Sequence, residues 1–212
     1  MTTSEPLYSL HERVWHWLQA AALGLLVLTG FALHFPDRFG IFGSMARALS
    51  WHTWIGAAMI ANAFLGLFYH FTAEKYHHFL PRMDDFTVGA VRQARFYLYG
   101  IFKGEPHPFE TDARQKLNPL QRVTYLSLLN ILLPYQIVTG VLMWGVARWP
   151  GAFQAMGGIR RLGPAHTLGA YLFLAFLIGH IYLATTGKTP LGLLRAMLTG
   201  HEEPGKPARP EE

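Results

Sequence analysis

Four long stretches of this sequence contain no charged residue. They lie between Arg13 and Asp37, between Arg47 and Glu74, between Arg122 and Arg148, and between Arg161 and Lys188. A helix of about 20 mostly apolar residues crosses the roughly 30 Å hydrocarbon core of a bilayer, whereas the helices of soluble proteins usually carry a charged face. The pattern predicts an all-α integral membrane protein, a four-helix bundle with helices near 14–35, 51–71, 122–146 and 165–186.

Composition narrows the chemistry that such a bundle can perform. Apolar residues make up 51% of the chain and charged residues 15%, which excludes a disordered chain. The sequence has no cysteine. Disulfides, thiolate zinc sites, iron–sulfur clusters held by cysteine and covalently attached c-type haem are therefore excluded, so His, Met or oxygen atoms would have to hold any metal cofactor.

The net charge of +5 is unevenly distributed along the chain. Thirteen of the eighteen Lys and Arg residues fall in the N-terminal segment, in the 72–122 connection and after residue 187, and five fall in the two remaining connections. Because basic residues resist translocation, we expect the N- and C-termini and the long connection to be cytoplasmic. The distribution points to membrane lipids rather than to nucleic acid as the partner of these charges.

Two segments outside the charge-free windows have patterns of their own. Within 84–103, Phe86 and Tyr97 lie at helical spacing on the face opposite the basic residues, which predicts an amphipathic helix along the cytoplasmic interface. Residues 202–212 are rich in Pro and Glu. We expect them to form a flexible tail after a single membrane domain over 1–201.

Histidines inside the windows are the strongest functional signal, because ionisable side chains in a bilayer are costly and tend to be functional. His166 and His180 are 14 residues apart, so one helix presents both on nearly the same face, about 21 Å apart along its axis. His16 lies at the depth of His180, and His52 at the depth of His166. Neutral imidazoles from two facing helices are suitable axial ligands for haem iron, so this arrangement predicts two stacked haems.

Other pairings have equally regular spacing. His16 and His34 are 18 residues apart, as are His52 and His70, and 18 residues make a whole number of helical turns. Spacing alone leaves these pairings open. His34 precedes Phe35 and Pro36, as expected of a helix end at the headgroups, and His70 is a reserve ligand or a proton-path residue beside Glu74 and His77.

Small residues suit the flat approach of a porphyrin. Gly56 follows His52 by one turn, and ordinary packing of small residues between membrane helices would explain it equally well.

Several motifs together resemble a known family. They are Arg13-Val14-Trp15-His16-Trp17, His52-x-x-x-Gly56, Lys116-Leu117-Asn118-Pro119-Leu120-Gln121-Arg122, Val138-Thr139-Gly140, and His166 with His180. In order and spacing, from about residue 8 to 201, they resemble the di-haem cytochrome b subunits of formate dehydrogenase, nickel–iron hydrogenase and thiosulfate reductase. The resemblance implies two haem b groups, one held by His16 and His180 on the cytoplasmic side and one held by His52 and His166 on the periplasmic side.

The resemblance also implies a function. It is membrane electron transfer in the bacterial inner membrane, between a periplasmic iron–sulfur or multihaem cytochrome c subunit and menaquinone or ubiquinone. The family's quinone pocket maps to Asn118, with Gln121 nearby, although a helix N-cap followed by proline explains Asn118-Pro119 as well. Arg13, and Arg160 or Arg161, are candidates for pairing with haem propionates or for anchoring at the interface.

The C-terminal segments 186–190 and 196–200 look more like those of thiosulfate-reductase-type subunits than those of formate dehydrogenase cytochromes. The identity of the partner enzyme is therefore open, and so is the direction of electron flow. One alternative is a stand-alone di-haem cytochrome b that oxidises a diffusible donor such as superoxide. The other is a haem-free membrane anchor or transporter, and the sequence lacks the paired broken helices common in transporters.

Overall fold

The computed structural model describes residues 6–38, 40–72, 83–109, 117–187 and 189–201, and these form helices and connections without a strand. The predicted tail over 202–212 lies outside the described residues.

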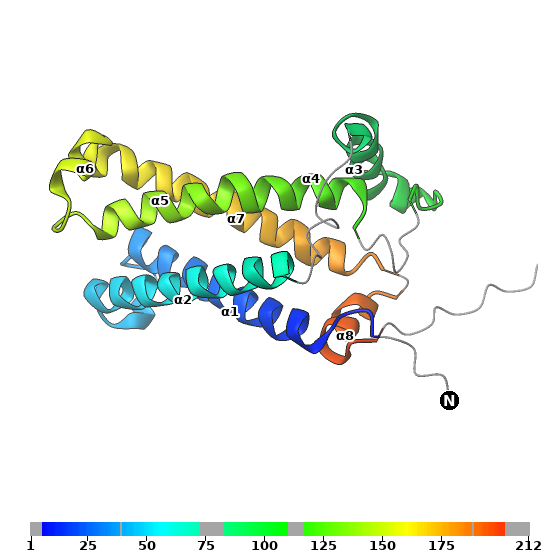
Figure 1. Ribbon diagram of the computed structural model, residues 1–212, viewed down its shortest axis with the longest axis horizontal. Coiled ribbons are helices and arrows are strands. Elements are labelled where there is room, and N and C mark those ends of the chain that lie inside the picture. Colours follow the sequence, from blue (N-terminus) through cyan, green and yellow to red (C-terminus); the bar gives the residue numbers. More distant parts are fainter. Residues whose placement is uncertain (1–5, 39, 73–82, 110–116, 188, 202–212) are drawn as a thin grey trace, which may run out of the picture.

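Two long helices, α1 (Leu10–His34) and α2 (Met45–Thr72), form an antiparallel pair that is one layer of the bundle (Figure 1). Ser9 begins α1 with a capping box, in which its side chain accepts a hydrogen bond from Glu12 N while the Glu12 carboxylate accepts one from Ser9 N. The helices approach closely at Gly66, where a Cβ atom would lie 2.2 Å from Trp15 Nε1. This contact holds the first turns of α1 against the end of α2.

The second layer pairs α7 (Gly158–Ala184) with a helix that starts as α4 (Pro119–Ser127), continues through a π-helical turn over Leu128–Leu132 and ends as α5 (Leu133–Trp144). The π turn ends two residues before Pro134, which has no N–H to donate to a regular α-helical ladder. Tyr135 fixes the layer by donating its hydroxyl to the carbonyl of Ala165, at 2.7 Å.

Short elements close the two ends of the bundle. At one end, the α6 end, lie α6 (Pro150–Ala155) and a 3-10 turn over Gly40–Phe42. At the other, the α8 end, lie α8 (Gly192–Thr199) and the segment that contains a π turn over Asp85–Gly89, α3 (Ala90–Leu98) and a 3-10 turn over Gly100–Lys103 (Figure 1).

The segment predicted as a helix over 84–103 buries Tyr97 of the expected apolar face, but it also buries polar residues and leaves Phe86 outside. Phe86 is 48% exposed, while Asp85 and Gln93 are buried together with Tyr97. The polar residues turn inward because their hydrogen-bond partners are there: Asp85 binds Arg122, and Gln93 contacts His107. Hydropathy spacing alone does not reveal such tertiary partners.

Three helical stretches of the described residues are long and apolar enough to cross a membrane: Leu10–His34, Pro119–Trp144 and Gly158–Ala184. The membrane character expected from the charge-free windows is thus supported for three of the four. Helix α2 has 28 residues and lies alongside α1 but is not among the three. The fourth span remains a prediction.

Helix boundaries differ from the predicted ones where a basic residue lies inside a helix. The second helix begins at Met45 rather than near 51, and α7 begins at Gly158 rather than near 165. Arg47 and Arg160 lie within the first turns of these helices, so a charge can end an apolar window without ending the helix. Long charged side chains extend to the interface from such positions.

Candidate functional site

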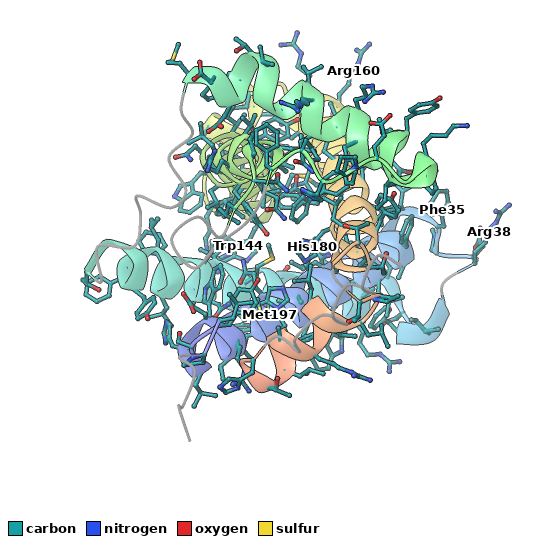
Figure 2. All side chains as sticks on the ribbon, turned by 90° about the vertical axis from the view of Figure 1, so that its right-hand side faces the viewer. Phe35, Arg38, Trp144, Arg160, His180 and Met197 are labelled. Atoms are coloured by element: carbon teal, nitrogen blue, oxygen red, sulfur yellow. The ribbon has the colours of Figure 1, made fainter. Side chains whose placement is uncertain are left out.

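Four histidines from three helices form two pairs. His16 on α1 faces His180 on α7, with ring centroids 6.0 Å apart. His52 on α2 faces His166 on α7, with ring centroids 6.2 Å apart. Each pair joins the α1/α2 layer to α7, and Figure 2, which views the molecule along the bundle, shows His180 inside it and Arg38 pointing away. We call them the α8-end pair (His16, His180) and the α6-end pair (His52, His166).

The separation of the rings suits a metal ion held between them. A metal–imidazole bond of about 2 Å on each side, together with the distance from each ring nitrogen to its ring centre, accounts for such centroid separations. In the part of the chain that the structure describes, no group of three or more His, Asp or Glu side chains converges on one point. Two histidines alone fit a metal whose other ligands come from a macrocycle, as in haem with two axial histidines.

The polar atoms around the four imidazole rings also fit a haem with two axial histidines. Within the described residues, the buried Nδ1 atom of His16 has no hydrogen-bond partner. At the α6 end, His52 Nδ1 lies 2.8 Å from Thr29 Oγ1, and His166 Nδ1 lies 3.0 Å from Thr139 Oγ1. A metal-binding histidine characteristically uses one ring nitrogen for the metal and the other for a hydrogen bond. The residues present therefore fit haem b at both pairs.

Glycines lie against two of the imidazole rings, but Gly56 is not one of them. A Cβ atom on Gly140 would lie 3.1 Å from His166 Cε1, and one on Gly30 would lie 3.8 Å from His52 Cε1. The nearest side-chain atom to a Cβ on Gly56 would instead be Leu26 Cδ2, at 3.9 Å. The structure thus places Gly30 and Gly140, rather than Gly56, against the imidazoles.

Among the side chains that the structure describes, the other histidines do not join these pairs. His34 is exposed at the end of α1, where its ring contacts Phe35. His70 belongs to α2 by its backbone, but its side chain lies outside the described residues, as do Glu74 and His77, so its role as a reserve ligand or proton-path residue stays a prediction. His11 packs its ring against that of Tyr69, with centroids 3.9 Å apart.

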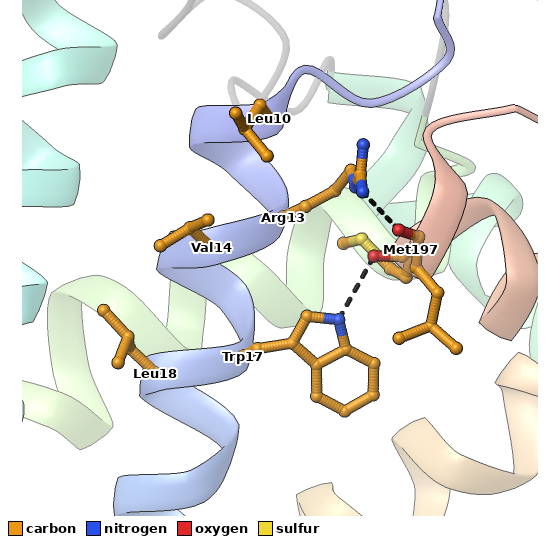
Figure 3. A pocket seen from close by; sticks show the side chains of 7 residues that line it. Leu10, Arg13, Val14, Trp17, Leu18 and Met197 are labelled. Atoms are coloured by element: carbon orange, nitrogen blue, oxygen red, sulfur yellow. Dashed lines mark hydrogen bonds between the residues drawn. The ribbon is translucent and has the colours of Figure 1, made fainter.

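Arg13 lies near the α8-end pair and is bound to α8. Its guanidinium donates to the carbonyl of Leu198, and Trp17 Nε1 donates to the carbonyl of Met197 at 3.1 Å. Figure 3 shows both bonds beside an apolar groove between α1 and α8, lined by Leu10, Arg13, Val14, Trp17, Leu18, Met197 and Leu198. Arg13 thereby satisfies a carbonyl in the last turn of α8, and its predicted pairing with a haem propionate stays a prediction.

Asn118 acts as a helix cap. Its Oδ1 atom accepts from Gln121 N at 2.9 Å, and Gln121 Oε1 accepts from Asn118 N at 3.0 Å. Its amide also donates to the Tyr97 hydroxyl at 3.0 Å, and Asn118 is 4% exposed. The cap interpretation is seen directly, and the predicted contacts of Asn118 and Gln121 with quinone stay predictions.

Three polar contacts of the α8 end were not found by sequence reasoning. Asp85 and Arg122 form a buried ion pair. Tyr97 also links elements, because it accepts from Asn118 and its carbonyl accepts from the Tyr182 hydroxyl at 2.9 Å. Burial raises the pKa of Tyr97, and the hydrogen bond from Asn118 acts in the opposite direction. In the sequence, the feature that could have indicated this ion pair is Arg122, a single arginine at the start of an apolar window.

Comparisons with known proteins show the family of the chain. A family model described as prokaryotic cytochrome b561 matches residues 7–200. The chain is 35% identical over 202 residues to the putative cytochrome YdhU of Escherichia coli (strain K12), which covers 92% of this chain and 73% of that protein.

Two further relatives are subunits of redox enzymes by name. A probable Ni/Fe-hydrogenase B-type cytochrome subunit of Cupriavidus necator is 25% identical, over 84% of this chain and 78% of that protein. The cytochrome b556 subunit of formate dehydrogenase of Haemophilus influenzae is 24% identical, over 89% of this chain and 72% of that protein. No solved structure gives a significant match. Because the family model matches nearly its whole length, the chain belongs to the prokaryotic cytochrome b561 family.

Proposed function

We propose that this protein is a membrane electron-transfer subunit that carries two haem b groups, one at each histidine pair. The observation that supports the proposal most strongly is the repetition of one geometry: two imidazole pairs, with centroids 6.0 and 6.2 Å apart, share α7 and lie toward opposite ends of the bundle. One histidine pair would be explained by packing. Two pairs along one helix suggest a path for electrons across the bilayer.

The protein's own contribution is to hold and orient the haems. His16 with His180 and His52 with His166 would supply the axial nitrogens, and the apolar helices keep water from the rings. Bound haem supplies the one-electron chemistry. Because the four ligands come from α1, α2 and α7, the correct pairing of the two layers is what assembles both sites.

The proposed topology has four spans in the bacterial inner membrane. Helix α2 supplies the fourth, because its side chains Trp54, Phe64 and Phe68 are 72%, 71% and 68% exposed, as expected where lipid covers them. The excess of Lys and Arg in the N-terminal segment, in the 72–122 connection and after residue 187 supports a cytoplasmic location for both termini and for that connection.

The two ends of the path would meet different partners. A periplasmic redox subunit, of the iron–sulfur or multihaem cytochrome c class, would dock at the α6 end, by analogy with the hydrogenase and formate dehydrogenase cytochrome subunits among the relatives. Menaquinone or ubiquinone would react at the α8 end, near Asn118 and Gln121. The buried position of Asn118 and its bond to Tyr97 place a hydrogen-bonded polar cluster there.

Haem stoichiometry tests the proposal directly. The full chain purified in detergent should give two haem b per polypeptide in a pyridine haemochrome assay. His16→Ala and His180→Ala should each remove the same haem, and His52→Ala and His166→Ala the other. His34→Ala is the matched control and should keep both, because His34 is exposed and outside the pairs. A colourless wild-type protein, or retention of both haems in all four pair variants, would refute the assignment.

A further inference from the structure

The two histidine pairs differ in what holds their imidazoles. At the α6 end, both rings have a threonine hydroxyl at Nδ1: Thr29 for His52 and Thr139 for His166, at 2.8 and 3.0 Å. At the α8 end, the buried Nδ1 of His16 has no partner among the described residues. Threonine therefore distinguishes one pair from the other.

Each threonine is itself fixed by its own helix. The hydroxyl donates to the carbonyl of the residue four positions earlier, at 2.8 Å for Thr29 and 2.9 Å for Thr139. A hydroxyl has one proton, so the oxygen can then only accept from the imidazole. Thr29 is fully buried and Thr139 is 6% exposed, so little water competes. His52 and His166 consequently carry their proton on Nδ1 and keep the lone pair on Nε2.

A third contact supports the same tautomer. Gln136 Nε2 lies 3.1 Å from His166 Nε2, and an amide N–H can donate only to a ring nitrogen that carries a lone pair. Binding iron at His166 Nε2 would replace this hydrogen bond, whereas the bond from Nδ1 to Thr139 is compatible with iron binding.

The threonines also restrict the orientation of the rings. Thr29 is on α1 while its histidine is on α2, and Thr139 is on α5 while its histidine is on α7. Each hydrogen bond therefore crosses the contact between the two helices of one layer. The ring orientation is tied to the packing of the layer rather than to the rotamer of the histidine alone.

We propose that Thr29 and Thr139 are positioning residues for the haem at the α6-end pair: they fix the Nδ1–H tautomer of both ligands and lower the midpoint potential of that haem. The inference rests on the proposed function. An acceptor at Nδ1–H makes the imidazole a more basic ligand, and a more basic ligand favours ferric over ferrous iron. Hydrogen bonding around the axial ligands is one of the means by which a protein sets haem potential.

A redox titration of the purified full chain, followed by the absorbance of both haems, tests this proposal. The variants are Thr29→Val and Thr139→Val, alone and combined, because valine keeps the branched shape and removes the acceptor. In the double variant, the ferrous-to-ferric ratio of the haem at the α6-end pair should rise about tenfold at a fixed potential, which is the low end of the effect of removing a ligand's hydrogen-bond partner. For a one-electron couple, this corresponds to a midpoint potential about 59 mV higher. The midpoint of the other haem should not change.

Controls separate hydrogen bonding from packing. Thr29→Ser and Thr139→Ser keep the hydroxyl and should restore the wild-type potential. Thr72→Val removes the same kind of bond to a carbonyl of its own helix, from an exposed position, and should change neither midpoint. Loss of one haem from a valine variant but not from its serine counterpart would also support the proposal.

Three results would overturn the inference: unchanged midpoints in the double valine variant, equal shifts of both haems, or valine and serine variants that behave alike. These results leave the proposed function intact, because two haems are still bound. A wild-type chain without haem would instead reject the proposed function itself. The failures of the two proposals are thus distinguishable.

Discussion

Arg122 binds both carboxylate oxygens of Asp85, with Nε at 2.8 Å from Oδ2 and Nη2 at 2.7 Å from Oδ1. The two side chains are 7% and 5% exposed. A third bond runs from Arg122 Nη1 to the carbonyl of Leu117 at 3.0 Å. The arginine thus fastens the start of α4 to the π turn before α3.

Breaking this pair from one side should be costly. Asp85→Ala leaves the Arg122 charge buried without its partner, which typically lowers the free energy of unfolding by about 3–5 kcal/mol. Replacing both residues together, Asp85→Leu with Arg122→Met, should recover most of that loss because no unpaired charge remains. Thermal unfolding in detergent, followed by circular dichroism, measures the difference.

The exposed pair of the same region is the control for the buried one. Arg95 donates to both oxygens of Glu105, and these side chains are 59% and 35% exposed. Solvent screens such a pair, so Glu105→Gln should leave the unfolding temperature unchanged. Equal destabilisation by Asp85→Ala and Glu105→Gln would show that burial does not make the Asp85–Arg122 pair more costly to break.

Gly140 and Gly30 provide a test of how closely helices approach the paired histidines. An alanine Cβ at Gly140 would lie 3.1 Å from His166 Cε1, tighter than ordinary contact, whereas at Gly30 it would lie 3.8 Å from His52 Cε1. Gly30→Ala should therefore gain up to about 1 kcal/mol of helix propensity. In Gly140→Ala, overpacking should cost about 1–3 kcal/mol, which offsets the gain in helix propensity, and the spectrum of one haem should shift. Unfolding measures the change in stability, and absorbance measures the spectral shift. Identical behaviour of the two variants would argue against steric control of His166.

Sequence patterns predicted the long helices better than the short ones, for a physical reason. The charge-free windows reflect the membrane itself, so three of them match helices with the composition of a span. Helices α6 and α8 have six and eight residues and were not predicted, because such short helices depend on tertiary packing rather than on local preference.

The histidine pairs were accessible to sequence reasoning because helix geometry is regular. The 14-residue spacing of His166 and His180 fixes both their depth and their face on α7, and the structure brings each beside the histidine expected at that depth. No comparable rule predicts Thr29 beside His52 or Asp85 beside Arg122. These contacts join separate helices, and their register depends on how the helices pack.

Tyr97 should ionise at a higher pH than exposed tyrosines. Burial raises the pKa of Tyr97 because it disfavours the phenolate. With a folded-state pKa above the unfolded one, its contribution to stability is present below the unfolded pKa and is lost as the pH rises through the folded pKa. Ultraviolet difference titration of the wild type against Tyr97→Phe isolates this group. A difference spectrum with an ordinary tyrosine pKa would show that Tyr97 is solvated.

A substitution that keeps the helix cap can separate the capping role of Asn118 from its proposed role in quinone binding. Serine is a good N-cap and retains an acceptor for Gln121 N, but it lacks the amide that donates to Tyr97. If that amide also serves a quinone, Asn118→Ser should slow oxidation of the reduced haems by a soluble quinone about tenfold or more, with the haem spectrum and unfolding temperature unchanged.

Tyr97→Phe is the companion variant, because it removes the acceptor of the Asn118 amide while leaving Asn118 in place. It should oxidise at nearly the wild-type rate if the quinone binds the amide, since that donor is then freed. Stopped-flow mixing of dithionite-reduced protein with the quinone measures both rates. A wild-type rate in Asn118→Ser would restrict Asn118 to capping α4, and the quinone would then have to bind through other residues of the α8 end.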